Sequence, residues 1–394
     1  MRRLGFHLTL GAMLSLSTPA AAAWRTAWMA APFPTTPVLV PDDLRVFERQ
    51  TVRQTIRVAT GGTRLRLRLS NELGGTAVRF AAVHVAKLDA DGRTIAGSDR
   101  AVTFATAAGA DIPAGAPLVS DAFALPVAPL DRLAISVVYR DRATPVAHLL
   151  RVAVGPGDQG SAATLANAVT ARAPAIVAAL ELNQATDGPL IVAIGDSITE
   201  GAGSTPGTFR GWPDRLAERF AARPAKHRPV IVNAGISGNR VLRDGAGPNL
   251  LARFDRDVLA VPGATHVILM EGINDIGNGE KTGAPVSAAE LIAAYGQAIA
   301  RAHAAGLRII GATLTPYRGA AYFTPAGEVT RQAVNRWIRT GGAFDGVIDF
   351  DRVVVDPADP SRIRAAFHPG DHLHPNDAGY AAMAAAIDPA LFTR

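Results

Sequence analysis

The chain contains no cysteine, which excludes disulfide bonds and thiolate chemistry. It also has no block of like charge, because 40 basic and 34 acidic residues give a net charge of only +6 and the basic residues are scattered. Nucleic-acid-binding proteins concentrate basic residues on one stripe or helix, so we expect no nucleic-acid partner. Beyond residue 23 no apolar run is long enough for a transmembrane helix, and we expect no stable membrane insertion.

The first 23 residues follow the pattern of a secretory signal peptide. Arg2 and Arg3 provide a positive start, residues 4–16 are mostly apolar, and residues 20–23 are alanines at which cleavage is expected. This pattern predicts a secreted or periplasmic protein. The length of the remaining chain predicts two domains, which we place at residues 24–186 and 187–394.

The first of these domains has the period of β-strands. In residues 63–70, leucines at 65, 67 and 69 alternate with arginines, as in an antiparallel strand with one buried face. Further strands are predicted at residues 53–58, 78–88, 133–139, 148–154 and 176–182, with turn-forming residues between them. The pattern predicts an all-β sandwich of jelly-roll type. We interpret the arginine row as a solvated strand face, with a site for acidic ligands as the alternative.

In the second domain, short apolar runs alternate with helical patterns. The runs are residues 190–194, 230–232, 266–270, 308–312 and 347–350, and the helical patterns are residues 212–220, 249–259, 288–305, 327–339 and 377–387. Ser287 and Glu290 form a predicted capping box at the start of the third helix. The alternation predicts an α/β fold whose parallel sheet is covered by helices on both faces. In such sheets the ligand crevice lies at the carboxyl ends of the strands.

Polar motifs follow the first three of these apolar runs. Gly195-Asp196-Ser197 follows the first, and a serine at a strand-to-helix turn can expose its hydroxyl to the crevice. By itself this tripeptide is also an ordinary turn sequence. Gly238 follows the second run and Asn274 the third. The backbone N–H groups of Ser197 and Gly238 and the Asn274 side chain would together form an oxyanion hole.

A histidine and an aspartate that could activate this serine lie near the end of the chain. Asp371 precedes His374 by three residues, so its carboxylate can orient the imidazole toward a serine. A metal site formed by His368, Asp371, His372 and His374 is the rival interpretation. No second ligand group with recognisable spacing is present elsewhere, so we expect neither a metal nor another cofactor.

Two other motif interpretations fail. The Gly-x-Ser-x-Gly nucleophile elbow of α/β-hydrolases does not occur. Gly201 and Gly203 suggest a dinucleotide-binding turn, but Pro206 occupies the place of the third glycine.

Taken together, these segments resemble the four blocks of the SGNH (GDSL-type) hydrolases, which are named for a Ser, a Gly, an Asn and a His. The matching residues are Ser197, Gly238, Asn274 and His374, and Asp371 matches the acid of the family's triad. The resemblance covers residues 190–394. It implies a flavodoxin-like three-layer fold, a metal-independent Ser-His-Asp mechanism and activity on carboxylic esters.

The N-terminal half resembles the accessory β-domain of some secreted bacterial members of the family. Two-domain chains of this kind resemble carbohydrate esterases, so the resemblance favours deacylation, above all deacetylation, of small-molecule or polysaccharide esters. A lipase, lysophospholipase or broad arylesterase remains an alternative. A glycan-binding protein with a vestigial hydrolase domain is a third, although the complete set of four blocks argues against it. The oligomeric state is left open by the sequence.

Residues 315–325 follow the fourth apolar run and should border the crevice. Tyr317, Tyr322 and Phe323 in this segment are predicted to shape recognition of the acyl group or the sugar. The alternative is that the three aromatic side chains only pack the loop against the domain.

Overall fold

The computed structural model describes residues 23–34, 44–183, 188–225 and 227–393. Apart from residue 23, the predicted signal peptide lies outside these residues, and so does the predicted domain boundary at residues 186 and 187. We refer to residues 23–183 as the β region and to residues 188–393 as the α/β region. Within the described part of the chain, no helix has both the length and the apolar character needed to cross a bilayer.

The β region is built from antiparallel sheets, in agreement with the predicted fold class. One sheet has the strand order β1-β13-β3-β8, with β9 also paired to β3, and the other has the order β12-β11-β2-β10-β5-β6. The strands are β1 (Trp24–Met29), β2 (Gln50–Arg57), β3 (Gly62–Ser70), β4 (Val78–Phe80), β5 (Ala82–Lys87), β6 (Arg100–Val102), β7 (Ala110–Ile112), β8 (Pro117–Val119), β9 (Phe123–Val127), β10 (Arg132–Tyr139), β11 (His148–Pro156), β12 (Val169–Ala175) and β13 (Val177–Asn183).

Strand β3 shows why this region folds as a sandwich. Its three leucines are completely buried in the core between the sheets, whereas Arg64 on the opposite face is exposed. Arg66 forms a 2.6 Å ion pair with Glu181 on β13, and Arg68 forms one of 2.8 Å with Glu72. Two of the three arginines in the predicted row therefore form ion pairs within the β region.

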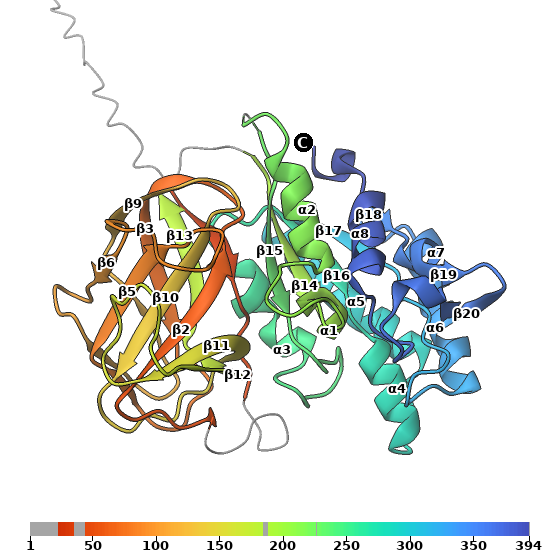
Figure 1. Cartoon of the computed structure of the whole chain (residues 1–394). Coiled ribbons are helices and arrows are strands. Elements are labelled where there is room, and N and C mark those ends of the chain that lie inside the picture. Colours follow the sequence, from red (N-terminus) through yellow and green to blue (C-terminus); the bar gives the residue numbers. More distant parts are fainter. Residues whose placement is uncertain (1–22, 35–43, 184–187, 226, 394) are drawn as a thin grey trace, which may run out of the picture.

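The α/β region has a five-stranded parallel sheet of order β15-β14-β16-β17-β18. Its strands are β14 (Leu190–Gly195), β15 (Val230–Gly235), β16 (His266–Met270), β17 (Arg308–Ala312) and β18 (Gly346–Ile348), and β19 (Val355–Asp356) with β20 (Asp359–Ile363) forms a separate hairpin. The helices are α1 (Ser197–Glu200), α2 (Trp212–Ala221), α3 (Leu250–Phe254), α4 (Ile273–Lys281), α5 (Ala288–Ala304), α6 (Pro325–Thr340), α7 (Phe350–Val354) and α8 (Asp377–Ala386). Figure 1 shows the sheet between helix layers, which confirms the predicted three-layer α/β/α class.

Local signals in the sequence account for several helix ends. Ser287 and Glu290 form the predicted capping box, with Ser287 N donating to the Glu290 carboxylate at 2.9 Å. Gly306, which follows α5, has a φ of 74°, a backbone conformation that glycine adopts without strain. Trp212 at the start of α2 is completely buried, as expected for a side chain that packs the helix onto the sheet.

Two predicted elements need correction, and a further helix was missed. The strand predicted at residues 78–88 is two strands, because β4 pairs with β7 whereas β5 pairs with β10. The helix predicted at residues 249–259 is α3 followed by a π-helix at Asp255–Leu259. Helix α4 was not predicted, since its sequence INDIGNGEK contains two glycines and two asparagines, which disfavour helix. Burial of its Ile273 and Ile276 in the core outweighs that propensity.

The two regions pack against each other along β1 and β15 (Figure 1). Met29, Phe33 and Leu149 of the β region are buried in the same apolar core as the parallel sheet. Polar contacts also cross the boundary: Thr26 N donates to Pro262 O at 3.0 Å, and Arg57 Nη1 lies 2.7 Å from Glu218 Oε1. The β region therefore lies against the edge of the parallel sheet that carries β15.

Candidate active site

Ser197 stands where the sequence places it, at the turn between β14 and α1. The side chain of Asp196 caps the helix by accepting from Ile198 N at 3.0 Å. Gly195, the last residue of β14, has no room for a side chain, because a Cβ there would lie 2.3 Å from both Met270 O and Thr199 Oγ1. This tight packing fixes the backbone on which Ser197 is carried.

The structure brings together the three residues of the predicted triad. Ser197 Oγ lies 2.9 Å from His374 Nε2, and His374 Nδ1 lies 2.6 Å from Asp371 Oδ2. The other oxygen of Asp371 accepts from the backbone N–H groups of Leu373 and His374 at 3.0 and 3.1 Å. Burial raises the pKa of Asp371, but these hydrogen bonds outweigh it and the pKa is lowered overall, so the carboxylate stays ionised.

The segment that carries His374 is docked on the loop that follows Ser197. Asp377 accepts from the backbone N–H and the hydroxyl of Thr205, at 2.7 and 2.8 Å. Tyr380 donates its hydroxyl to Ala202 O at 2.5 Å, and a Cβ on Gly203 would lie 2.9 Å from the Cβ of His374. Gly201 and Gly203 therefore belong to the loop that supports the histidine.

Gly238 and Asn274 occupy the neighbouring strand ends. Gly238 has a φ of 77° in a turn closed by the hydrogen bond from Asn239 N to Ile236 O at 3.1 Å. Asn274, in the first turn of α4, donates one N–H to Asn239 O at 3.0 Å and accepts from the Tyr322 hydroxyl at 3.2 Å. Since the amide carries two hydrogens, a second donor remains on Asn274. These contacts tie the Asn274 side chain to the loop that carries Gly238.

A buried arginine that the sequence analysis did not single out connects the same strand ends. Arg253, from α3, has a side chain with no exposed surface. Besides Asp257 Oδ2 in its own helical segment, at 3.3 Å, it donates to four groups: Gly195 O at 2.8 Å, Ala234 O at 2.7 Å, Asn239 Oδ1 at 2.7 Å and Glu271 Oε2 at 3.0 Å. These four partners follow or end β14, β15 and β16. One guanidinium therefore fixes the positions of the three segments that carry Ser197, Gly238 and Asn274.

The carboxyl group of Glu271, which accepts a hydrogen bond from Arg253, has an unusually high pKa. Burial raises its pKa to about 8, although Arg253 opposes this, and the neighbouring Asp196 and Asp275 raise it further. Its Oε1 has no hydrogen-bond partner among the described residues. Burial also raises the pKa of Asp196, to about 7. Glu271 is therefore protonated at neutral pH.

This charge state predicts a dependence of stability on pH. Glu271 has a pKa of about 8 in the folded protein and of about 4.3 in an unfolded chain. Between these values the folded state holds more protons, so the free energy of unfolding decreases as pH rises. In Glu271→Gln this loss is absent. Thermal melting from pH 5 to 8 should give a flatter curve for the variant than for the wild type, and parallel curves would contradict the assignment.

In the aromatic loop of residues 315–325, the position of Tyr317 differs from the predicted role in substrate recognition. Tyr317 is completely buried, with its ring centroid 5.1 Å from that of Phe323 and 6.0 Å from that of Tyr322, so it cannot contact a substrate. Tyr322 and Phe323 are partly exposed. Tyr322 alone contacts a predicted site residue, through its hydroxyl on Asn274. Its ring also covers Gly277 of α4, where a Cβ would lie 2.1 Å from the ring. Tyr317 therefore packs the loop, and Tyr322 lies at the site.

The residues of the rival metal interpretation are arranged differently from a ligand set. The rings of His368 and His372 lie 4.4 Å apart, whereas His374 is turned toward Ser197 and Asp371. Within the described residues, no group of three or more His, Cys, Asp or Glu side chains is placed to hold a metal ion.

Sequence reasoning missed the groups that hold the predicted site in place. Glu271 directly follows the apolar run of residues 266–270, and this position is a signal that could have drawn attention to it, whereas Arg253 lies among other charged residues and has no such signal. Asn239, which follows Gly238, was not singled out, yet its buried side chain also donates to Ala246 O and Pro248 O at 2.8 and 2.9 Å. Glu200, three residues after Ser197, was not singled out either.

Comparisons with known proteins show which family the α/β region resembles. Residues 193–382 match the model of the GDSL-like Lipase/Acylhydrolase family, whereas a comparison with curated proteins finds no match. Solved structures similar to this chain include a GDSL-like lipase from Bacteroides thetaiotaomicron VPI-5482, with 22% identity, a TM-score of 0.38, and coverage of 51% of this chain and 87% of that one. A member of the lipolytic protein G-D-S-L family from Veillonella parvula DSM 2008 has 21% identity, a TM-score of 0.36 and coverage of 50% and 96%.

A mutant of Axe2, an acetyl-xylooligosaccharide esterase from Geobacillus Stearmophilus, has 23% identity and a TM-score of 0.42, with coverage of 53% of this chain and 96% of that one. In each case the similarity extends over about half of the present chain and nearly all of the other. The chain therefore contains, at residues 193–382, a domain that matches the GDSL-like Lipase/Acylhydrolase family of hydrolases, with a β region in front of that domain.

Proposed function

We propose that this protein is a secreted serine esterase that removes small acyl groups, acetyl above all, from carbohydrate esters. The observation that carries the esterase part is the continuous chain of hydrogen bonds from Ser197 Oγ through His374 to Asp371, at 2.9 and 2.6 Å. A serine hydroxyl is a poor nucleophile alone and needs a base that is itself oriented. This arrangement provides both.

The proposed reaction proceeds through an acyl-enzyme. His374 takes the proton of Ser197 as the hydroxyl oxygen attacks the ester carbonyl, and Asp371 stabilises the imidazolium that forms. The N–H groups of Ser197 and Gly238 and the free amide hydrogen of Asn274 donate to the oxyanion. The alcohol leaves with the proton held by His374. Water then attacks the acyl group by the same route and regenerates Ser197.

The preference for a small acyl group is supported by the aromatic loop. The hydroxyl of Tyr322 lies 3.2 Å from Asn274 Oδ1, so a bulky side chain stands directly beside a proposed oxyanion donor. Tyr322 is held there by Tyr317 and by the ring's close approach to Gly277. Such a fixed aromatic group limits the room beside the reacting carbonyl.

The carbohydrate part is supported by the position of the β region. Jelly-roll sheets are common in lectin domains, and strand β12 reaches the motif of the nucleophile, where Arg172 Nη2 lies 3.2 Å from Glu200 Oε1. An extended polysaccharide bound at Ser197 would therefore lie beside the β region. The acyl chain of a lipid would make no comparable contacts with this surface.

Hydrolysis of a matched substrate panel tests the proposal. The purified chain and its Ser197→Ala variant are compared on acetylated xylan, an aryl acetate, and aryl esters of longer acyl chains. We expect serine-dependent release of acetate from the polysaccharide and a steep loss of kcat/KM as the acyl chain lengthens. A preference for long chains would assign the protein to the lipid hydrolases instead, and the absence of any serine-dependent turnover would overturn the esterase proposal.

A further inference from the structure

The carboxylate of Glu200 connects the β region to the loop that carries Gly238. Its Oε2 accepts from the backbone N–H of Ser237 at 2.5 Å. Its Oε1 lies 3.2 Å from Arg172 Nη2 on β12 and 3.7 Å from His148 Nε2 on β11. One side chain in the motif of the nucleophile therefore joins Ser237, next to a proposed oxyanion donor, to two basic residues of the other region.

His148 is held in a fixed orientation toward Glu200. Its Nδ1 lies 2.7 Å from Ala31 O, and because a carbonyl oxygen only accepts, Nδ1 must carry the hydrogen. Nε2 faces the carboxylate at 3.7 Å, a distance at which the imidazolium form makes an ion pair but no hydrogen bond. The imidazole is nearly completely buried and packs edge-on against Phe33, with ring centroids 5.2 Å apart. The β region thus presents a pre-oriented partner to Glu200.

Glu200 is ionised at neutral pH. Burial raises its pKa, but the contacts with His148, Arg172 and Ser237 N lower it to about 2 overall. A charged acceptor forms a stronger and shorter hydrogen bond to a backbone N–H than a neutral one. The contact with Ser237 is accordingly among the firm attachments of this loop.

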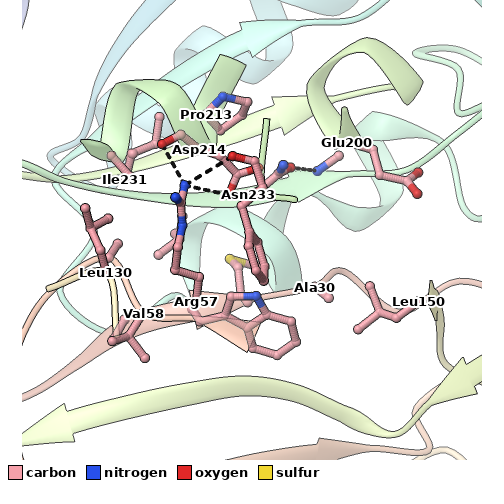
Figure 2. A pocket seen from close by; sticks show the side chains of 18 of the residues that line it. Ala30, Arg57, Val58, Leu130, Leu150, Glu200, Pro213, Asp214, Ile231 and Asn233 are labelled. Carbon is pink, nitrogen blue, oxygen red and sulfur yellow. Dashed lines mark hydrogen bonds and ion pairs between the residues drawn. The ribbon is translucent and has the colours of Figure 1, made fainter. Parts of the chain in front are cut away.

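The backbone of Glu200 is closely packed, but its side chain has free space beside it. A Cβ on Gly235 would lie 2.3 Å from Glu200 N, so the end of α1 is pressed against the end of β15. Figure 2 shows the Glu200 side chain at the margin of a cavity of about 170 Å³ between the two regions, which is also lined by His148 and Asn233. Hydrogen bonds and ion pairs, not close packing on all sides, therefore set the position of the carboxylate.

The loop from Ile236 to Asn239 has two separate anchors. Asn239 is held by Arg253 and Asn274, both from the α/β region. Ser237 is held by Glu200. Gly238, whose φ of 77° gives the loop its sharp turn, lies between these anchors. A shift of Ser237 would rotate the peptide that carries the Gly238 N–H.

We propose that His148 and Arg172 of the β region are positioning residues for the oxyanion hole, acting through Glu200 on the peptide between Ser237 and Gly238. This inference rests on the proposed esterase function of Ser197. It gives the β region a role in the chemical step, apart from any binding of the substrate. Its consequence is that both anchors belong to the α/β region, but the anchor at Glu200 depends on contacts from the β region.

A pair of substitutions at His148 tests this link. In His148→Asn the side-chain amide takes the place of Nδ1 and can still donate to Ala31 O, but the shorter side chain no longer reaches Glu200. In His148→Gln the amide nitrogen takes the place of Nε2 and can donate to Glu200. Because misplacement of a catalytic group by about 1 Å can cost up to about 100-fold in rate, we expect His148→Asn to lose about tenfold in kcat on an aryl acetate. We expect KM to be unchanged and His148→Gln to keep most of the activity.

Affinity for a boronic acid inhibitor provides a second readout. The tetrahedral adduct of a boronic acid with the serine places an oxygen in the oxyanion hole. The Ki of this inhibitor should therefore rise in His148→Asn by the same factor by which kcat/KM falls. Arg57→Met is the matched control, since Arg57 also bridges the regions, through Glu218, but has no contact with Glu200. Arg57→Met should have the same Ki for the boronic acid and the same kcat as the wild type. Arg172 is 46% exposed, so Arg172→Met is expected to fold and to weaken Ki in the same direction even if His148→Asn does not fold.

The outcomes separate this inference from the proposed function. Absence of Ser197-dependent turnover in the wild type would overturn the esterase proposal and this inference with it. An active wild type whose kcat and Ki are unchanged in His148→Asn and Arg172→Met would overturn the inference alone. An equal loss in Arg57→Met would also overturn it, because the effect would then belong to the interface as a whole.

Discussion

Ser197→Ala and His374→Ala are each expected to lower kcat on an aryl acetate by about 10⁴- to 10⁶-fold. The double variant is expected to be no worse than either single variant. The reason lies in the contact of 2.9 Å between Ser197 Oγ and His374 Nε2, because within the described residues His374 is the base in contact with this hydroxyl and the hydroxyl is the group whose proton it removes. The two groups act as a unit, so the second substitution removes nothing that the first has left.

Steady-state and single-turnover rates of the three variants measure this coupling. Ser204→Ala is a suitable control, since Ser204 lies in the supporting loop and its hydroxyl donates locally, to Gly201 O at 2.6 Å. It should retain most of the activity. Melting temperatures within a few degrees of the wild type would show that each variant folds. Losses that multiply in the double variant would contradict a shared role for Ser197 and His374.

Arg253→Met is expected to lower the free energy of unfolding by about 3–5 kcal/mol, as when one partner of a buried charged network is removed. Methionine fills part of the space but donates nothing. Gly195 O keeps its bond from Ile236 N, but Ala234 O and the side-chain oxygens of three further residues lose a buried donor; these residues are Asn239, Asp257 and Glu271. Each buried acceptor left unsatisfied costs about 1–3 kcal/mol before the surroundings relax.

Urea denaturation of the variant and the wild type measures this difference. Arg301→Met provides the control, because Arg301 pairs with Asp255 at 2.6 Å on a partly exposed surface, where such pairs contribute about 0–1 kcal/mol. If Arg253→Met were as stable as Arg301→Met, the guanidinium would not be the connection between the strand ends that its contacts indicate.

The predicted site depended on motifs that can be recognised from neighbouring residues. Ser197, Gly238 and Asn274 each follow an apolar run, and parallel strands bring such positions to one edge of a sheet. Asp371 and His374 are close in the sequence, so their contact needs little more than a turn. These features are local, and the sequence displays them directly.

The parts that could not be predicted depend on contacts between distant segments. Arg253 lies in a segment predicted as an amphipathic helix, and nothing in that pattern shows that its side chain turns inward to Gly195, 58 residues earlier. The link from His148 to Glu200 requires knowledge of how β11 lies against α1. Helix α4 was missed because burial of its apolar side chains outweighs its poor helix propensity. Tyr317 was misplaced because an aromatic residue in a loop has the same sequence signature whether it packs inward or faces a ligand.

Covalent labelling of the nucleophile tests the central claim most directly. The purified protein is treated with a fluorophosphonate, which phosphonylates activated serines, and the modified peptide is identified by mass spectrometry. The triad geometry predicts one adduct per chain, on Ser197, with labelling strongly slowed in His374→Ala and loss of esterase activity in step with labelling. A protein that hydrolyses esters while Ser197 remains unlabelled, or that is inactivated by labelling at another residue, would contradict the assignment of Ser197 as the nucleophile.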